Sequence, residues 1–272
     1  MSQAGQVPAV GVARVPDVLH AEWTKLRTLA GTFWLLAGAV AVTIAVSAAA
    51  CAATTCSSLG CQADPGKVSL TGVQVGQAIV AIIGVLAIST EYSSGLIRVT
   101  LTAMPHRGWV LAAKAALVGG LVLAVSAVAV LGSVLAGQLI LPGHGFTAAH
   151  GFAALSLDEA PVLRAACGSV LYLALIALLS LGVAVAVRDS AAAIGTVLAL
   201  LYLFPVIAAV ISNQHWQRHL EQISPMTAGL YIQATVGVRT LPLTPWQGLG
   251  VLGLWAAGAL LLGGLVLRLR DA

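Results

Sequence analysis

The sequence predicts an all-α integral membrane protein with six transmembrane helices. Of its 272 residues, 59% are hydrophobic and only 8% are charged, and the mean hydropathy is +0.99. Soluble domains usually carry about 25% charged residues. A water-soluble fold could not keep this composition off its surface, so lipid must be the solvent for most of the chain. The apolar runs are also continuous, whereas a membrane β-barrel would alternate apolar and polar residues in short strands.

Each span requires about 20 apolar residues, because a helix rises 1.5 Å per residue and the hydrocarbon core is about 30 Å thick. The predicted spans cover residues 29–50, 71–89, 110–141, 163–187, 191–212 and 246–267. The third is long enough to tilt or to project from the membrane. Only Arg188, Asp189 and Ser190 separate the fourth span from the fifth, so these two helices must be antiparallel neighbours.

Residues 1–28 precede the transmembrane domain (residues 29–272) as a cytoplasmic tail with an amphipathic interfacial helix. Pro16-Asp17 is a typical helix start, with Asp17 as the N-cap. An apolar stripe at helical spacing follows: Leu19, Trp23, Leu26 and Ala30. The residues that suit the membrane interface are Glu22, Trp23, Lys25 and Arg27. The helix is either a membrane-surface anchor alone or an anchor that also contacts a cytoplasmic partner.

A second amphipathic element, within residues 90–114, connects the second and third spans. Its narrow polar stripe falls at i, i+4, i+7 and i+11: Glu91, Gly95, Arg98 and Thr102. Pro105 ends this helix, and His106-Arg107-Gly108 turns the chain into the next one. The element is too apolar to stand free in water. We therefore expect a cytoplasmic helical hairpin that lies against the membrane surface, the other spans or a groove on a partner protein.

Lys and Arg indicate the orientation of the spans. Nine fall on the side of the N-terminus and four on the opposite side, which predicts that both termini are cytoplasmic in a multi-pass plasma membrane protein. The first span ends in Ala48-Ala49-Ala50, a possible signal-peptide cleavage site, but its full length favours a retained span. The net charge is +4, yet the basic residues are scattered at the ends of apolar runs, so no nucleic-acid partner is expected.

The cysteines and histidines give weaker signals. Cys51, Cys56 and Cys61 lie at the outer end of the first span or in the first outer loop. One disulfide bond would fit an oxidising exterior, and free thiols would fit equally well. Their spacing is not C-x-x-C. His215 and His219 could share a helix face and bind a metal ion, but this is the weaker interpretation, and no metal or cofactor is predicted.

Several kinds of catalytic and coupling residues are missing. No Asp, Glu, Lys, Arg or His occupies the central part of any predicted span, which argues against proton coupling and, less strongly, against sodium coupling. The sequence has no G-x-x-x-x-G-K-[ST] phosphate loop and no catalytic constellation within the spans. The chain is therefore not expected to be an enzyme, and an intramembrane enzyme is the least favoured function.

The polar residues inside the spans are uncharged, and most are expected to form hydrogen bonds between helices. Gln74, Gln77 and Gln138 are the best candidates for lining a translocation path, because a glutamine amide in lipid needs polar partners.

Two stretches resemble a known family. Residues Glu91-x-x-x-Gly95, Leu101, Pro105, Arg107 and Lys114 resemble the segment that follows the second span in ABC-2 type transporter permeases. The opening Glu22-Trp23-Thr24-Lys25-Leu26-Arg27 is similar to the N-terminus of a large actinobacterial subgroup of these permeases. The six spans, the N-terminal amphipathic helix and the hairpin extend the resemblance over the whole chain.

The resemblance implies a permease that forms a homodimer or heterodimer and binds two copies of a separate ATPase subunit. The N-terminal helix and the hairpin would dock on the ATPase. The coupling residues would be Glu91, Gly95, Arg98, Pro105 and Arg107. Residues 213–245 would correspond to short re-entrant helices, with Met226 to Val238 half-inserted.

The expected function is therefore the membrane subunit of an ATP-binding cassette exporter in a bacterial plasma membrane. Its substrate would be hydrophobic or amphipathic, and ATP would be hydrolysed on the partner chain. The alternative is a non-transporting anchor, sensor or assembly protein.

Overall fold

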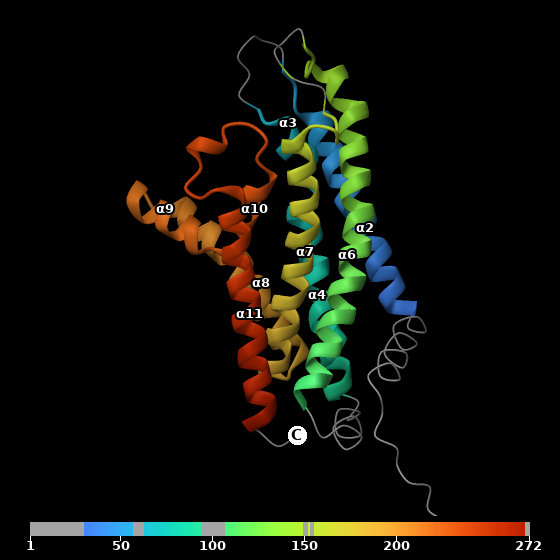
Figure 1. Cartoon of the computed structure of the whole chain (residues 1–272), viewed down its shortest axis with the longest axis vertical. Helices are drawn as coiled ribbons and strands as arrows, with labels where there is room; N and C mark the ends of the chain where they lie inside the picture. The colour runs from blue at the N-terminus through green and yellow to red at the C-terminus, as the bar shows by residue number, and fades with distance from the viewer. Residues whose placement is uncertain (1–29, 57–62, 94–106, 149–151, 153–154, 270–272) are drawn as a thin grey trace, which may run out of the picture.

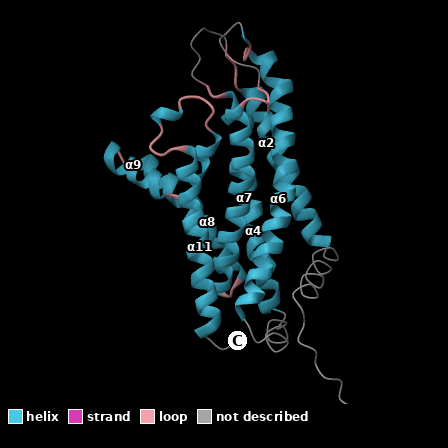
Figure 2. Ribbon diagram, in the orientation of Figure 1, coloured by secondary structure: helices cyan, strands magenta, loops and turns pink. Residues whose placement is uncertain are grey.

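A computed structural model describes residues 30–56, 63–93, 107–148, 152 and 155–269. In these residues the chain consists of helices and loops, without a strand (Figure 2). Six of the helices are long and apolar enough to cross a membrane. The predicted all-α fold with six spans is confirmed.

The six long helices coincide with the predicted spans. They are α2 (Ala30–Ala53), α4 (Val73–Ser93), α6 (Arg107–Ile140), α7 (Ala160–Val187), α8 (Ser190–Val210) and α11 (Pro245–Leu269). The largest difference is at the end of α4, which continues four residues beyond the predicted span, while α6 and α7 each begin three residues earlier than predicted. In α7 the reason is Pro161, which is tolerated in a first helical turn because the N–H that proline lacks would have no partner there.

Shorter helices connect the long ones at one end of the bundle. They are α3 (Pro65–Ser69), η1 (Leu141–His144), α9 (Gln214–Ile223), α10 (Pro225–Leu230), η3 (Tyr231–Gln233) and η4 (Val238–Thr240). The segment between α8 and α11 thus contains short helices, as predicted for residues 213–245. Helix α10 is buried against the bundle, whereas α9 projects sideways from it (Figure 1).

Helix α7 is the central element of the bundle. It packs against α4, α6, α8 and α11, and its large side chains Tyr172, Leu173 and Ile176 are almost fully buried. The turn to α8 is as tight as predicted. Arg188 adopts a left-handed conformation (φ 62°) that ends α7, and the Asp189 side chain accepts a hydrogen bond from the N–H of Ala192 at 2.7 Å, which caps α8.

Small residues let the backbones of α7 and its neighbours come into contact. A Cβ atom at Gly84 of α4 would lie 2.5 Å from the carbonyl oxygen of Ala177 in α7. A Cβ atom at Gly182 of α7 would lie 2.5 Å from the carbonyl carbon of Ala259 in α11. In lipid there is no hydrophobic force between helices, so close packing of this kind supplies much of the association energy.

Aromatic and basic residues mark the two ends of the spans. Trp246 begins α11 and is 56% exposed, while Arg268 lies in its last turn. The 22 helical steps from Trp246 to Arg268 correspond to about 33 Å, close to the hydrocarbon thickness of about 30 Å. Trp109, 63% exposed at the start of α6, lies at the Arg268 end. Tryptophan at both ends is typical of membrane interfaces.

Both predicted amphipathic elements lie mainly outside the described residues. This applies to the N-terminal helix with Glu22, Trp23, Lys25 and Arg27. It also applies to Gly95, Arg98 and Pro105 of the hairpin. The structure places the backbone of Glu91 in the last turns of α4 and begins α6 at Arg107.

Replacing Gly84 with leucine is expected to lower the thermal unfolding midpoint of the protein in mild detergent. The added side chain would push α4 away from α7, and overpacking of this kind typically costs about 1–3 kcal/mol. The matched control is Gly120→Leu in α6, where a Cβ atom meets nothing within 4 Å. Circular dichroism measures the unfolding midpoints. Equal midpoints for the two variants would contradict the backbone contact between α4 and α7.

Candidate functional site

The ends of four long helices converge around Arg188, at the turn between α7 and α8. Its guanidinium carbon lies 5.8 Å from the ring centre of Tyr92 in α4, a cation–π distance. Its Nη2 donates a hydrogen bond to the carbonyl oxygen of Val266 in α11 at 3.4 Å. A single side chain therefore links α4, α11 and the α7–α8 turn.

Lys114 adds a second cationic link at the same end. It is only 4% exposed, and its Nζ donates to the carbonyl oxygen of Ala87 in α4 at 3.3 Å. A buried ammonium group is costly without partners, so this contact holds α6 and α4 in register. The sequence placed Lys114 near the cytoplasmic end of a span, but its acceptor could not be identified from spacing.

These contacts lie next to the predicted coupling element. Glu91 immediately precedes Tyr92 in α4, and Arg107 opens α6 one residue before Gly108. A Cβ atom at Gly108 would lie 3.3 Å from the Arg268 guanidinium. The two helices that flank residues 94–106 are thus joined, through Lys114 and Arg188, to the rest of the bundle.

Two glutamines of α4 lie at contacts with neighbouring helices. Gln77 is fully buried, and its Oε1 accepts a hydrogen bond from the hydroxyl of Tyr172 in α7. The Gln74 backbone oxygen accepts from the Tyr202 hydroxyl in α8 at 2.8 Å. Both contacts connect helices, which is the role expected for most polar residues in the spans. A path along these glutamines stays a prediction.

A second polar cluster fastens the segment after α10 to the opposite end of the bundle. The Asp64 carboxylate caps α3 and accepts hydrogen bonds from the N–H groups of Thr235 (2.6 Å) and Val236 (2.9 Å). Arg164 of α7 donates to the carbonyl oxygen of Ala234. Gln233 is fully buried and donates to the Ser169 hydroxyl at 3.2 Å. Sequence reasoning missed this cluster, although Asp64-Pro65 is a helix-start signature.

Gln138 lines a cavity at this same end of the bundle. The cavity has a volume of about 370 Å³ and lies between α6, η1 and the loop after η1. Phe146 and Phe152, with ring centres 5.0 Å apart, form part of its wall. Gln138 is therefore separated from Gln74 and Gln77, which contact α8 and α7.

The cysteines at this end differ in oxidation state. Cys56 is disulfide-bonded, whereas Cys51 and Cys167 carry free thiols. Cys51 and Cys56 pack with Leu141 and Phe146 in a small buried cluster. One disulfide bond is thus formed here, and Cys51 does not take part in it.

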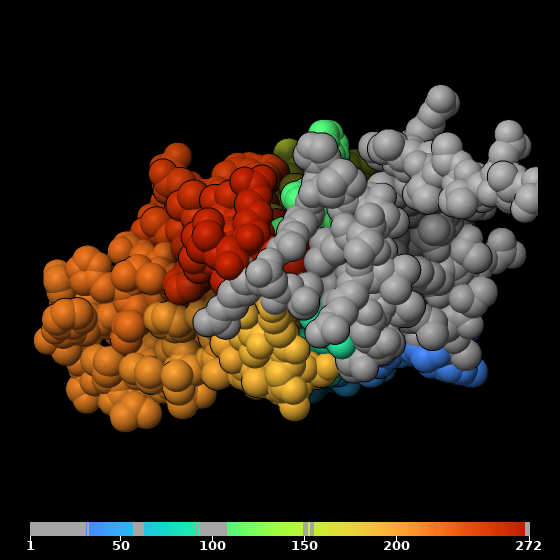
Figure 3. Space-filling model, turned by 90° about the horizontal axis from the view of Figure 1, so that it is seen from below, coloured from blue at the N-terminus to red at the C-terminus, as the bar shows by residue number. Residues whose placement is uncertain are grey.

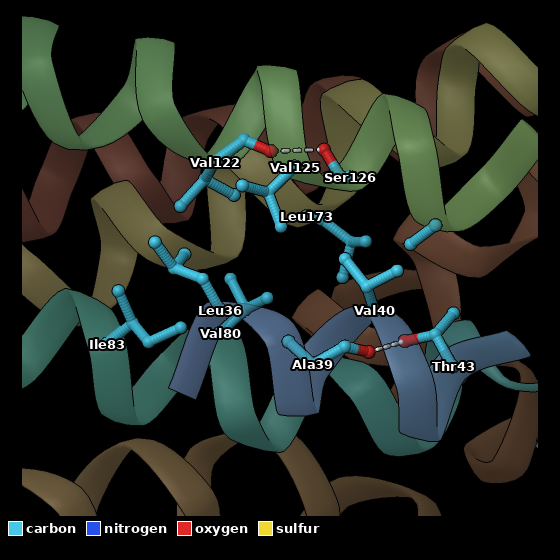
Figure 4. A pocket seen from close by; sticks show the side chains of 11 residues that line it. Leu36, Ala39, Val40, Thr43, Val80, Ile83, Val122, Val125, Ser126 and Leu173 are labelled. Carbon is cyan, nitrogen blue, oxygen red and sulfur yellow. Dashed lines mark hydrogen bonds between the residues drawn. The ribbon is translucent and has the colours of Figure 1, made fainter. Parts of the chain in front are cut away.

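The interface of α2, α4, α6 and α7 encloses a very small cavity (Figure 4). Its volume of about 10 Å³ holds at most one water molecule. The hydroxyls beside it, of Thr43 and Ser126, donate back to carbonyl oxygens of their own helices, Ala39 and Val122. This interface therefore offers no passage for a substrate.

His215 and His219 share a face of α9, as predicted, with ring centres 4.5 Å apart. Within the described part of the chain, no group of three His, Cys, Asp or Glu residues could hold a metal ion. The pair has no third ligand there.

No protein-family model matches the chain, and no curated protein matches it in sequence. The helices, their contacts and the residues at their ends therefore carry the functional argument.

Replacing Tyr172 with phenylalanine is expected to destabilise the protein by about 1 kcal/mol, because the buried Gln77 oxygen loses its donor. Gln77→Leu should have a similar cost, and the double variant should cost less than the sum. Tyr202→Phe is the control, since its acceptor is a helical backbone carbonyl. Additive unfolding free energies for Tyr172 and Gln77 would contradict the proposed pair.

Proposed function

We propose that this chain is the membrane subunit of an ABC-2 type ATP-binding cassette exporter. It would move a hydrophobic or amphipathic substrate with the energy of a separate ATPase subunit. The observation that carries the proposal is the set of contacts around Arg188 and Lys114. These contacts join five spans (α4, α6, α7, α8 and α11) beside the residues that resemble the coupling segment of such permeases.

The lack of an energy source in this chain supports a separate ATPase subunit. The spans lack an ionisable residue in their central parts, and the sequence lacks a phosphate loop. A transporter of this composition needs an energy source on another chain. The end of the bundle at Arg188 offers a place to receive it, because α4 ends and α6 begins there, on either side of residues 94–106.

Coupling would work by a shift between two packings of the helices. A displacement of residues 94–106 would act first on the ends of α4 and α6, which flank them. Lys114 would keep these two helices together, and Arg188 would pass the displacement to α7, α8 and α11. The direct backbone contacts at Gly84 and Gly182 favour movement of helices as rigid bodies.

A dimer would supply the path. The helix interface that Figure 4 shows is closed to anything larger than water, so a substrate would pass along a surface shared between two copies or between this chain and a related permease. Many exposed residues of the spans are small or aliphatic, which permits close contact with a second chain.

The disulfide bond supports the proposed orientation. Disulfides persist on the outer side of the plasma membrane and are rare in the cytoplasm. Cys56 follows α2, so the end of the bundle near Cys56 would be outside and the end near Arg188 inside. The distribution of Lys and Arg gives the same orientation, with both termini in the cytoplasm of a bacterium.

The second candidate is a non-transporting anchor, sensor or assembly protein. The tight contacts inside the described bundle would suit it equally well. A neighbouring gene that encodes a phosphate-loop ATPase favours the exporter, and an isolated gene favours the anchor.

Alanine at Glu91 or Arg107 is expected to leave membrane insertion intact and to weaken binding of the ATPase. The measurement is a pull-down of the tagged chain from mild detergent, with ATP hydrolysis assayed on the eluate. Glu159→Ala and Arg239→Ala are matched controls, because they remove the same charges from the opposite end of the bundle.

A full yield of ATPase with both test variants would rule out the coupling assignment. A wild-type chain that purifies without any ATPase, even beside the products of neighbouring genes, would favour the anchor.

The proposed topology predicts that a C-terminal tag is hidden from an impermeant antibody in intact cells and becomes accessible after permeabilisation. A tag inserted after the exposed Arg239 should be accessible in both conditions. The reverse pattern would overturn the orientation.

A further inference from the structure

An apolar groove runs along the surface of the bundle between α7, α8 and α11. Its volume is about 520 Å³, within the range of ligand sites. Apart from Gln222 and the indole of Trp255, its lining consists of aliphatic side chains and glycine. Leu254 and Leu262 on its edge are 75% and 62% exposed. The groove therefore opens toward the surface that lipid would cover.

Small residues create the groove. Gly182 brings α7 into backbone contact with Ala259 of α11, so the floor is recessed. Gly258 lines the groove, and a Cβ atom there would meet nothing within 4 Å. On the α8 side, Trp255 is held by an edge-to-face contact with Phe204, at 6.4 Å between ring centres. These contacts hold the floor and one wall of the groove in place.

The shape of the groove selects a narrow occupant. On α11 it extends from Val251 to Leu262, which is 11 helical steps or about 16 Å. Over that length, a helix about 10–12 Å across would occupy more than about twice the volume of the groove. A transmembrane helix of a second chain, about 10–12 Å across with its side chains, is too wide to enter. An extended hydrocarbon chain is narrow enough, and its length in one leaflet is about 15 Å.

Helix α9 closes one end of the groove and carries a cationic side chain, Arg218. Its residues Gln222 and Ile223 line the groove, and the Trp255 indole donates to the Ile223 carbonyl oxygen at 2.9 Å. One turn before them on the same helical rows lie Arg218 and His219, both exposed. From these anchored residues α9 projects away from the spans (Figures 1 and 3).

The acidic residue of α9 does not cancel this charge at the groove. Glu221 accepts a hydrogen bond from the Tyr231 hydroxyl at 3.1 Å, on the side of η3. Burial, together with the nearby Glu221, raises the pKa of Tyr231, so its hydroxyl stays protonated and remains a donor. Arg218 is thus the cationic side chain one turn from the groove, and His219, whose ring packs against His215, lies beside it.

We propose that the groove binds one acyl chain of an anionic phospholipid, with the lipid head group at Arg218 and His219. The bound chain would fill the space between α8 and α11 and hold α9 over it. The site needs the membrane location of the protein but no ATPase, so its test is independent of the exporter function.

Native mass spectrometry of the full chain, exchanged into micelles with phosphatidylglycerol or phosphatidylcholine, tests the site. The wild type is expected to retain one phosphatidylglycerol and to lose phosphatidylcholine. Gly258→Trp should abolish retention by filling the groove. Gly253→Trp is the matched control, on the same helix at another open position outside the groove. Arg218→Gln should leave the fold intact and remove the preference for phosphatidylglycerol.

Equal retention by Gly258→Trp and Gly253→Trp would overturn the site. Equal retention of both lipids by the wild type would overturn the head-group assignment. If Gly258→Trp converts a dimer to a monomer without changing lipid retention, the groove is a contact between copies and the proposal is wrong. A second measurement uses the wild-type protein and a phosphatidylglycerol with brominated acyl chains. This lipid should quench the fluorescence of Trp255, which is obtained by subtracting the fluorescence of Trp255→Phe from that of the wild type.

Discussion

The backbone contact between α7 and its neighbours is the constraint on which the rest of the structure depends. At Gly84 and Gly182 a single methyl group would collide with the facing main chain. Between helices in lipid, dispersion contacts and hydrogen bonds replace the hydrophobic effect as the main source of stability. Because α7 is packed so tightly, Tyr172 can reach Gln77 and Ser169 can reach Gln233. The polar contacts follow from the packing and then fix the rotation of each helix.

The polar contacts between the helices lie mainly at the two ends of the bundle, which affects how the helices can move. Arg188 and Lys114 tie the spans at one end, and Asp64, Arg164 and Gln233 tie them at the other. Between the two ends the contacts are mainly apolar, and apolar contacts have no hydrogen-bond geometry that fixes one arrangement of the helices. A bundle of this kind can change its packing by exchanging a few polar contacts at its ends while the helices stay intact. This agrees with coupling at the Arg188 end and a response at the Asp64 end.

Hydropathy alone predicted all six spans, because continuous apolar runs in a lipid-soluble composition leave few alternatives to helices. The short turn at Arg188 was also predicted, since only three residues separate the two predicted spans. The partners of individual polar residues were not predictable. Gln77 is an amide that needs a partner, but whether it meets Tyr172 or a substrate depends on the rotation of α4, which its apolar pattern does not determine. Asp64 was not singled out from the sequence, because its contacts with Thr235 and Val236 join parts of the chain far apart in sequence.

The use of small residues explains both the closed interior and the open groove. Where two glycine-bearing faces meet, as at Gly182 and Ala259, the helices touch and leave no space. Where such a face meets no third helix, as at Gly258, the same lack of side chains leaves a channel one hydrocarbon chain wide. Space for a ligand therefore lies on the outside of this bundle and not through it. A bundle built in this way has room for apolar molecules at its surface, where the groove between α7, α8 and α11 opens.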